Sequence, residues 1–184
     1  QEGDQLTLGD LLYGLLLSSG NDAATAIAEH ISGSEEAFVE EMNARAKELM
    51  AVNTHFTNPH GLHDDNHYTT AYDLYLIFNT CIQNEEFMKV IETESYTASI
   101  KEADGSVRTE EWKPTNYYAR GIVNAPDGVT VVGGKTGTTG EAGYCLILLD
   151  RNSADHPYIS IVMGAGSRDI LYQNMNALLE GTQN

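Results

Sequence analysis

The chain is short of cysteine, of basic side chains and of long apolar runs, and each shortage excludes a class of protein. Cys81 and Cys145 are too few for a disulfide framework and lack metal-ligand spacing, so we expect small buried thiols. Ten Lys and Arg residues face 27 Asp and Glu residues, and the net charge of -17 disfavours nucleic acids and anionic membranes as partners. The most apolar run, Leu11 to Leu17, is far shorter than the ~20 residues of a membrane span. What remains is 41% apolar residues, enough for the core of one domain.

Helical patterns fill the first half of the chain. Thr7 with Asp10, and Thr70 with Asp73, have the spacing of capping boxes, in which each side chain bonds to the backbone of the other residue. Ser34 is followed by two glutamates, which favours a helix start at this point. Caps and apolar periodicity together predict helices over about 7–18, 22–31, 34–50 and 70–82, with a long polar loop around 58–61.

The second half has the character of a sheet. Asp104-Gly105 is a strong hairpin signal between two β-rich segments, 96–100 and 107–112. Further strands are predicted over 129–132, 144–149 and 158–163, and their short connections favour antiparallel neighbours. A last helix over about 170–179 is expected to cover one face of the sheet. The sequence thus predicts an α+β fold in a single domain, 1–184, with a helical part over 1–92 and an antiparallel-sheet part over 93–184.

Two short motifs lie far apart in the chain, and only the tertiary fold could bring them together. Ser19-Gly20-Asn21 stands at a helix–helix junction, and Lys135-Thr136-Gly137 stands at the end of a β-branched run. They match the second and third signatures of the penicillin-recognising serine acyl-transferases. In their wider strings, Leu11–Ala24 and Gly133–Cys145, they resemble the low-molecular-mass D-alanyl-D-alanine carboxypeptidases, which are penicillin-binding proteins of serine peptidase family S11. The segment over 58–73 is similar to the same family, so the resemblance covers nearly the whole chain.

The first signature of that family, Ser-x-x-Lys, is absent. No lysine follows a serine by three positions, because the residues at that spacing are Ala44, Glu86, Ala98, Glu110 and Val132. The resemblance implies that this motif holds the nucleophilic serine and the lysine that takes its proton. We therefore expect the chain to be part of a longer protein whose Ser-x-x-Lys lies upstream of its first residue, and we expect the chain alone to be inactive.

The resemblance also implies catalytic roles for residues that are present. Ser19 would relay the proton towards the leaving amine, and the amide of Asn21 would hold the peptide carbonyl of the substrate. Lys135 would add positive potential beside the reacting carbonyl and hold the hydroxyl of Thr136 in place. These groups require no cofactor and no metal.

Three further residues are expected to contact the substrate. Gly137 would leave room for the substrate backbone against the strand. The backbone N–H of Thr138 would be one of two oxyanion-hole donors, and the other would come from the missing nucleophile. Arg168 would receive the terminal carboxylate, although a solvated arginine near the start of the last helix is an open alternative.

The activity implied by the resemblance is that of a serine-type D-alanyl-D-alanine carboxypeptidase. Such an enzyme trims the terminal D-Ala from peptidoglycan pentapeptides ending in D-Ala-D-Ala, through an acyl-enzyme, and β-lactam antibiotics acylate the same serine. A bacterial cell-wall enzyme of this kind works outside the cytoplasm, in the cell wall or periplasm or on the outer face of the cytoplasmic membrane. Whether the full-length protein also has a membrane anchor is open.

Other enzyme classes fit the same residues less well. Gly134-Lys135-Thr136 is similar to the end of a phosphate-binding loop, but the glycine needed five positions before Gly134 is Val129, and a strand follows instead of a helix. No Gly-x-Ser-x-Gly occurs, which excludes an α/β-hydrolase elbow. A class A β-lactamase would need a deacylating glutamate, usually just before Leu-Asn, and no Leu-Asn pair occurs.

Two alternatives remain open. His60, His63 and His67, with Asp64 and Asp65, could form a metal cluster, although hydrogen bonding within a polar loop is the simpler interpretation because no His-Glu-x-x-His is present. The chain could also be a non-catalytic module that keeps the fold in order to bind peptidoglycan or a partner. An upstream Ser-x-x-Lys would decide for the enzyme.

Overall fold

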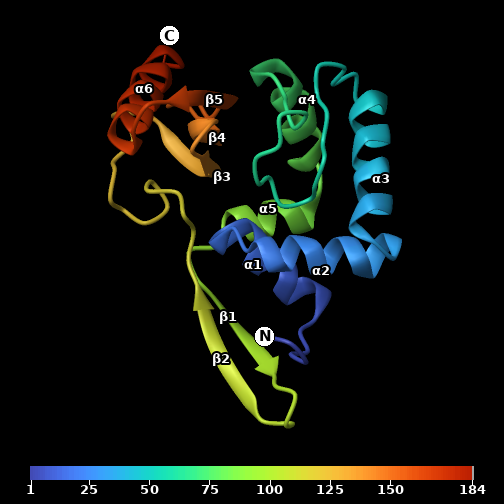
Figure 1. The fold of residues 1–184 in the computed structure, drawn as a ribbon. Helices are drawn as coiled ribbons and strands as arrows, with labels where there is room; N and C mark the ends of the chain where they lie inside the picture. Colours follow the sequence, from blue (N-terminus) through green and yellow to red (C-terminus); the bar gives the residue numbers. More distant parts are fainter. Residues whose placement is uncertain (184) are drawn as a thin grey trace.

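The computed structural model describes residues 1–183, which form a helical part, a projecting hairpin and a sheet covered by the last helix (Figure 1). The helices are α1 (Leu8–Ser18), α2 (Asn21–Ser32), α3 (Glu35–Glu48), α4 (Ala71–Cys81), α5 (Glu85–Ile91) and α6 (Arg168–Gly181). The strands are β1 (Tyr96–Lys101), β2 (Val107–Trp112), β3 (Thr130–Thr139), β4 (Gly143–Arg151) and β5 (Pro157–Ala165). All strand pairs are antiparallel, and the predicted α+β fold is confirmed.

The strands form two sheets instead of one. β1 and β2 make a two-stranded hairpin, and β3, β4 and β5 make a three-stranded sheet in that order. The hairpin points away from the rest of the molecule (Figure 1). Its outer end is held by an ion pair between Arg108 and Asp4, 2.6 Å long, and by a backbone bridge between Gln5 and Lys101. The hairpin therefore packs against the N-terminal segment and not against the sheet.

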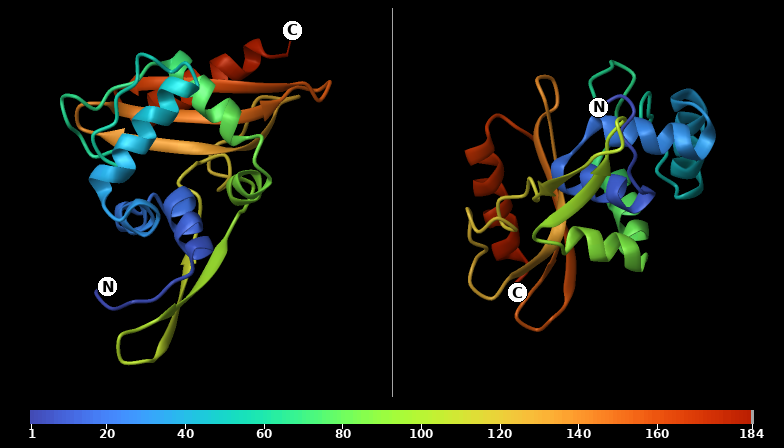
Figure 2. Two further views of the ribbon diagram at one scale, coloured as in Figure 1. Left: turned by 90° about the vertical axis from the view of Figure 1, so that its right-hand side faces the viewer. Right: turned by 90° about the horizontal axis from the view of Figure 1, so that it is seen from below.

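Helices lie on both faces of the three-stranded sheet (Figure 2). On one face, Leu148 of β4 belongs to a buried cluster with Met175 of α6. On the other face, the next residue, Leu149, packs with Phe78 of α4 and Ile91 of α5. Successive strand residues point to opposite faces, so β4 contributes to both cores. The predicted covering of one face by the terminal helix is confirmed, and the helical part occupies the other face.

Helix caps predicted from the sequence explain where α1 and α3 begin. The side chain of Thr7 accepts from the N–H of Asp10, and the carboxylate of Asp10 accepts from the N–H of Thr7, which completes a capping box. Ser34 accepts from the N–H of Ala37 at the start of α3. These caps fix the start of α1, and hence the position of the turn at its far end.

At α4 only half of the predicted capping box forms. Thr70 accepts from the N–H of Asp73, but the carboxylate of Asp73 turns away from the cap. It accepts instead from the N–H of Asn53 and the hydroxyl of Thr54, at 2.7 and 2.8 Å. Asp73 is only 1% exposed, so this buried carboxylate ties the segment after α3 to the start of α4.

The sequence pattern does not predict α5. This helix has seven residues, too few turns for an apolar periodicity to emerge. Its only strong local signal is Asn84, whose side chain accepts from the N–H groups of Glu86 and Phe87. Packing against the sheet stabilises a helix that its sequence alone would not.

The strand that carries the second motif is longer than predicted. The β-branched run ends at Val132, yet β3 continues through Lys135 to Thr139. Glycine disfavours a strand, but pairing with β4 stabilises this segment, because Gly134 lies opposite Leu148 and Gly137 opposite Cys145. The expectation that the strand ends with the β-branched run, just before the motif, was wrong, because the motif lies inside β3, which is an edge strand among residues 1–183.

No helix within residues 1–183 is long and apolar enough to cross a membrane. Cys81 and Cys145 are both free and partly buried, and burial raises the pKa of the Cys81 thiol.

Candidate active site

The turn between α1 and α2 carries the first motif. Ser19 is the C-cap of α1, with a φ of 59° in the left-handed region that glycine usually occupies. The N–H of Gly20 reaches back to the carbonyl oxygen of Gly14 over 3.2 Å, and α2 begins at Asn21. The motif is therefore a tight, hydrogen-bonded turn at the end of a capped helix.

Lys135 of β3 meets this turn. Its Nζ donates to Oγ of Ser19 over 2.7 Å and to the carbonyl oxygen of Thr136 over 2.7 Å. Two motifs that lie far apart in the chain thus share a direct hydrogen bond. The predicted proximity of Ser19 and Lys135 is confirmed, while the roles assigned to them stay predictions.

Thr115 joins the same two elements a second time. Its backbone N–H donates to the carbonyl oxygen of Leu17 in α1 over 3.1 Å. Its hydroxyl lies 2.5 Å from the hydroxyl of Thr136 on β3. Sequence analysis missed this residue, because a single threonine in a loop shows no local pattern that marks a contact with either element.

A cavity of about 240 Å³ opens beside these contacts. It is bounded by the α1–α2 turn, the segment after the hairpin, β3, β4 and the first turns of α6. Its lining residues are Ser19, Thr115, Thr136, Gly137, Thr138, Tyr144, Arg168, Leu171 and Tyr172. Five of the seven residues predicted for the site therefore line one cavity, and Lys135 touches it through Ser19.

The free edge of β3 forms one wall of this cavity. Within residues 1–183, β3 pairs with β4 alone, so part of its backbone N–H and C=O groups face away from any strand. Gly137 and Thr138 are exposed there, and a methyl group placed on Gly137 would meet no atom within 4 Å. An extended peptide can add to such an edge through main-chain hydrogen bonds.

Arg168 is the first residue of α6 and lines the same cavity as Ser19. It donates to the hydroxyl of Tyr117 over 2.8 Å, and its guanidinium carbon lies 5.2 Å from the centroid of the Tyr117 ring. The side chain is exposed, and no carboxylate within residues 1–183 pairs with it. A held, unpaired guanidinium at a helix N-terminus favours an anion, which supports the substrate-carboxylate interpretation over a merely solvated arginine.

Asn21 is not drawn into these contacts. It is exposed at the start of α2, and its side chain makes no hydrogen bond to Lys135 or to any other residue within the described part of the chain. Its predicted role at the substrate carbonyl stays a prediction.

Burial changes the acid–base behaviour of Lys135. Removal of the ammonium from water lowers the pKa of Lys135 to about 8. An amine with a pKa in this range can hold or release a proton close to neutral pH, which an ordinary surface lysine cannot do.

We expect Lys135 to titrate near pH 8 in the folded chain, as followed by NMR of its side-chain nitrogen. Because its pKa is lower in the folded than in the unfolded state, the unfolded chain binds more protons above pH 8. The free energy of unfolding should therefore rise between about pH 8 and 10.5, and the Lys135→Gln variant should lose this rise. A titration near pH 10.5 in the folded chain would contradict the buried amine.

The histidine loop uses its side chains internally. His67 accepts from the N–H of Thr57 over 3.1 Å, and His60 accepts from the N–H of Leu62 over 3.2 Å. Among residues 1–183, no three His, Cys, Asp or Glu side chains lie close enough to hold a metal ion. Loop-shaping hydrogen bonds thus account for these histidines better than a metal cluster.

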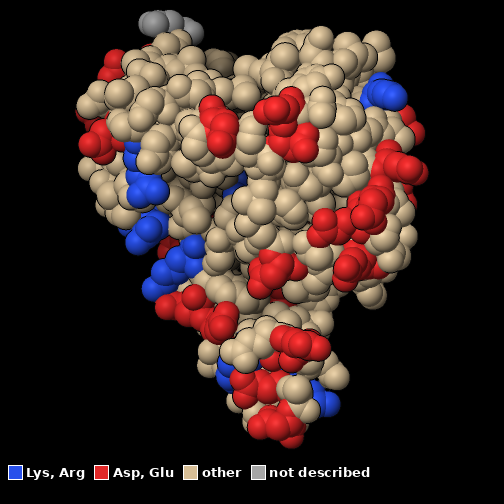
Figure 3. Space-filling model, viewed as in Figure 1, with Lys and Arg blue, Asp and Glu red and all other residues tan. Residues whose placement is uncertain are grey.

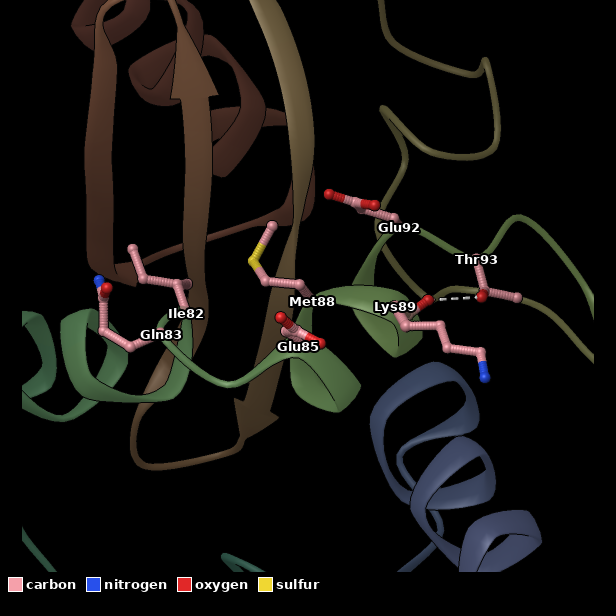
Figure 4. A pocket seen from close by; sticks show the side chains of 7 residues that line it. All are labelled: Ile82, Gln83, Glu85, Met88, Lys89, Glu92 and Thr93. Carbon is pink, nitrogen blue, oxygen red and sulfur yellow. Dashed lines mark hydrogen bonds between the residues drawn. The ribbon is translucent and has the colours of Figure 1, made fainter.

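A second hollow lies at the corner between α4 and α5 (Figure 4). Its volume is about 420 Å³, and Ile82 and Met88 form its apolar part. Lys89 points away from Met88, and Thr93 donates to the carbonyl oxygen of Lys89 over 2.7 Å. Neither motif contributes a residue to this hollow, so it has no connection with the site around Ser19.

Comparison with known proteins places this site in context. The family model of peptidase S11, D-alanyl-D-alanine carboxypeptidase, matches residues 1–167. The D-alanyl-D-alanine carboxypeptidase DacF of Bacillus subtilis (strain 168) is 36% identical over 167 residues, which are 91% of this chain and 40% of that protein. The D-alanyl-D-alanine carboxypeptidase of Streptomyces sp. (strain K15) is 40% identical over 152 residues, which are 79% of this chain and 50% of that protein. The chain thus spans half or less of the length of these relatives.

Solved structures are similar in fold. The Streptomyces K15 DD-transpeptidase aligns with a TM-score of 0.85 at 32% identity, over 98% of this chain and 68% of that one. The D-alanyl-D-alanine carboxypeptidase DacD from Francisella tularensis aligns with a TM-score of 0.80 at 27% identity, over 95% of this chain and 51% of that one. The family match covers both motifs and the two strands, β3 and β4, that border the cavity, and it ends one residue before Arg168. The chain therefore belongs to the D-alanyl-D-alanine carboxypeptidase family, peptidase S11.

Proposed function

We propose that this chain is part of a serine-type carboxypeptidase that removes the terminal D-Ala from peptidoglycan stem peptides ending in D-Ala-D-Ala. The observation that carries the proposal is the 2.7 Å hydrogen bond from Lys135 to Ser19 on the wall of a cavity that Arg168 also lines. The same cavity would take β-lactam antibiotics. Because peptidoglycan lies outside the cytoplasm, the protein would act there, and a membrane anchor on a longer chain is compatible with that.

The hydroxyl–amine contact suits proton transfer in acyl transfer. The nucleophilic oxygen bonds to the carbonyl carbon of the penultimate D-Ala, and the C–N bond to the terminal D-Ala breaks. The nucleophile loses a proton and the leaving amine gains one. Ser19 and Lys135 can relay this proton, because an amine with a pKa of about 8 exchanges protons near neutral pH. Water then hydrolyses the ester and frees the shortened peptide.

The remaining groups suit peptide binding. The free edge of β3 can pair with the substrate backbone, and Gly137 leaves the space that this requires. Arg168 lines the same cavity, and it would bind the terminal carboxylate of a peptide lying along β3. These features support a substrate with a free carboxyl terminus close to the scissile bond.

The nucleophile is the part that the 184 residues do not contain. We propose that a Ser-x-x-Lys elsewhere in the protein supplies the attacking serine, its base and the second oxyanion-hole donor. Loss of one such donor costs about 10²–10³ in rate, and without the nucleophile no acyl-enzyme can form.

Intact-mass spectrometry after incubation with a penicillin tests this proposal. The 184-residue chain should gain no mass, and a longer chain with Ser-x-x-Lys upstream of Gln1 should gain one acyl group per molecule. The longer chain with the serine of that motif replaced by alanine is the control and should gain nothing.

Two outcomes would contradict the proposal. A stoichiometric adduct on the 184-residue chain that disappears in Ser19→Ala would make Ser19, activated by Lys135, the nucleophile. A longer chain that binds D-Ala-D-Ala peptides but forms no adduct would make the protein a binding module.

A further inference from the structure

Basic residues without an acidic partner gather at this site. Five of the ten Lys and Arg residues form ion pairs with carboxylates: Arg45, Lys89, Arg108, Lys113 and Arg151. Within residues 1–183, Lys47 and Lys101 are unpaired and lie elsewhere. The other three unpaired residues are Arg168, which lines the cavity, Lys135, which bonds to Ser19 at its wall, and Arg120, which shares the ring of Tyr117 with Arg168. Figure 3 shows Lys and Arg side chains gathered between α6 and the hairpin, whereas Asp and Glu are spread over the whole of this face, including the edges of that cluster. In a protein of charge -17, this clustering marks a place for an anion.

Arg120 stands on a loop that is fixed to α6. The ring of Tyr117 stacks on Tyr172 of α6, with centroids 5.0 Å apart and planes 8° apart. The N–H of Tyr117 also donates to the hydroxyl of Tyr172 over 2.8 Å. Within the loop, the N–H of Gly121 donates to the carbonyl oxygen of Tyr118 over 3.0 Å, which closes a turn with Arg120 at its third position. The backbone that carries Arg120 is therefore held in place.

Two guanidinium groups share the ring of Tyr117. The guanidinium carbon of Arg168 lies 5.2 Å from the ring centroid and that of Arg120 lies 5.9 Å from it, so about 11 Å at most separates them. Arg168 is further held by the tyrosine hydroxyl. Arg120 is exposed and makes no hydrogen bond within the described residues. One guanidinium is thus anchored beside the cavity, and the other lies on the same tyrosine ring without a hydrogen-bond partner among the described residues.

We propose that Arg120 is a second carboxylate-binding residue of this site, which joins Arg168 on the terminal carboxylate of the substrate. The proposal rests on the proposed function. Two guanidinium groups can surround both oxygens of a free carboxylate, whereas a terminal amide or a continuing peptide chain offers them no negative charge. Arg120 would therefore raise the selectivity for peptides that end directly after the scissile bond.

Binding of N-acetyl-D-Ala-D-Ala and of its C-terminal amide to the 184-residue chain, measured by NMR titration, tests Arg120. The unsubstituted chain should prefer the acid. Arg120→Gln should weaken acid binding about three- to tenfold, leave amide binding unchanged and reduce the salt dependence of acid binding. Arg168→Gln should weaken acid binding more, Arg120→Lys should restore part of the loss, and the control Arg45→Gln on α3 should behave as the unsubstituted chain.

The outcomes separate this proposal from the function on which it rests. If the unsubstituted chain prefers the acid and Arg168→Gln abolishes the preference, but Arg120→Gln changes nothing, only the role of Arg120 is wrong. An equal loss of acid and amide binding in Arg120→Gln would make the residue structural, which also overturns the proposal. If the unsubstituted chain binds neither ligand, or does not prefer the acid, the proposed substrate class fails together with Arg120.

Discussion

Lys135→Ala is expected to lower the rate of penicillin acylation by about ten- to a hundred-fold or more in a protein that carries Ser-x-x-Lys upstream. A hydrogen bond to a charged group is worth roughly 1.5–3 kcal/mol, and this one joins the amine to Ser19. The same amine bonds to the carbonyl oxygen of Thr136, so its loss also frees the strand that borders the substrate. Stopped-flow acylation rates on the two proteins give the measurement.

The same substitution should leave the fold intact. Burial lowers the pKa of Lys135, which means that the folded chain does not gain from the charged form of this amine. Thermal melts of Lys135→Ala near neutral pH should therefore lie no lower than those of the unsubstituted protein, and Lys47→Ala, an exposed lysine on α3, serves as the control for both measurements. An unchanged acylation rate would refute the catalytic role, and a collapsed melt would make Lys135 structural.

Two glycines of β3 should respond in opposite ways to alanine. At Gly134, a methyl group would collide with the backbone carbonyl oxygen of Ile147 and with Leu148 on the neighbouring strand. Overpacking of this kind costs about 1–3 kcal/mol or more, which corresponds to roughly 2–12 °C or more in melting temperature for a chain of this size. Gly134→Ala should therefore melt much lower than the unsubstituted chain or fail to fold.

At Gly137, a methyl group meets nothing in the protein, so Gly137→Ala should melt normally. We expect it instead to lose at least about tenfold in acylation, because the methyl group would occupy the space of the substrate backbone. Gly140→Ala, just after β3, also meets nothing within 4 Å and lies outside the cavity lining, so it is the matched control for both readouts. Normal acylation by Gly137→Ala would show that no peptide lies against this part of β3.

Local signals in the sequence were sufficient for the starts of α1 and α3, but not for α5. Thr7 and Ser34 mark the starts of α1 and α3, because a cap depends on residues three positions apart. At Asp73 the predicted hydrogen bond to the cap does not form. Its carboxylate instead accepts from the backbone N–H of Asn53, which belongs to another segment. A sequence pattern shows which bonds are available, and the tertiary fold decides which of them form.

Only those residues of the site that belong to a recognisable motif could be predicted from the sequence. Ser19 and Lys135 could be paired in advance because family resemblance supplies the contact that their separation hides. Thr115 has the same kind of position between α1 and β3, but its two contacts depend on the path of the loop after the hairpin. For the same reason, the position of Arg120 near Arg168 could not be predicted from the sequence, because it depends on the stacking of Tyr117 against α6.

The left-handed backbone of Ser19 affects which residue is most stable at this position. Glycine would adopt a φ of 59° without strain, whereas serine stores about 1–2 kcal/mol there. Replacement by glycine would relieve this strain, but it would also remove the hydrogen bond from Lys135, which is worth at least as much. Selection for heat resistance alone therefore gives glycine no advantage at this position, and the contact of the hydroxyl with Lys135 offsets the strained backbone that carries it.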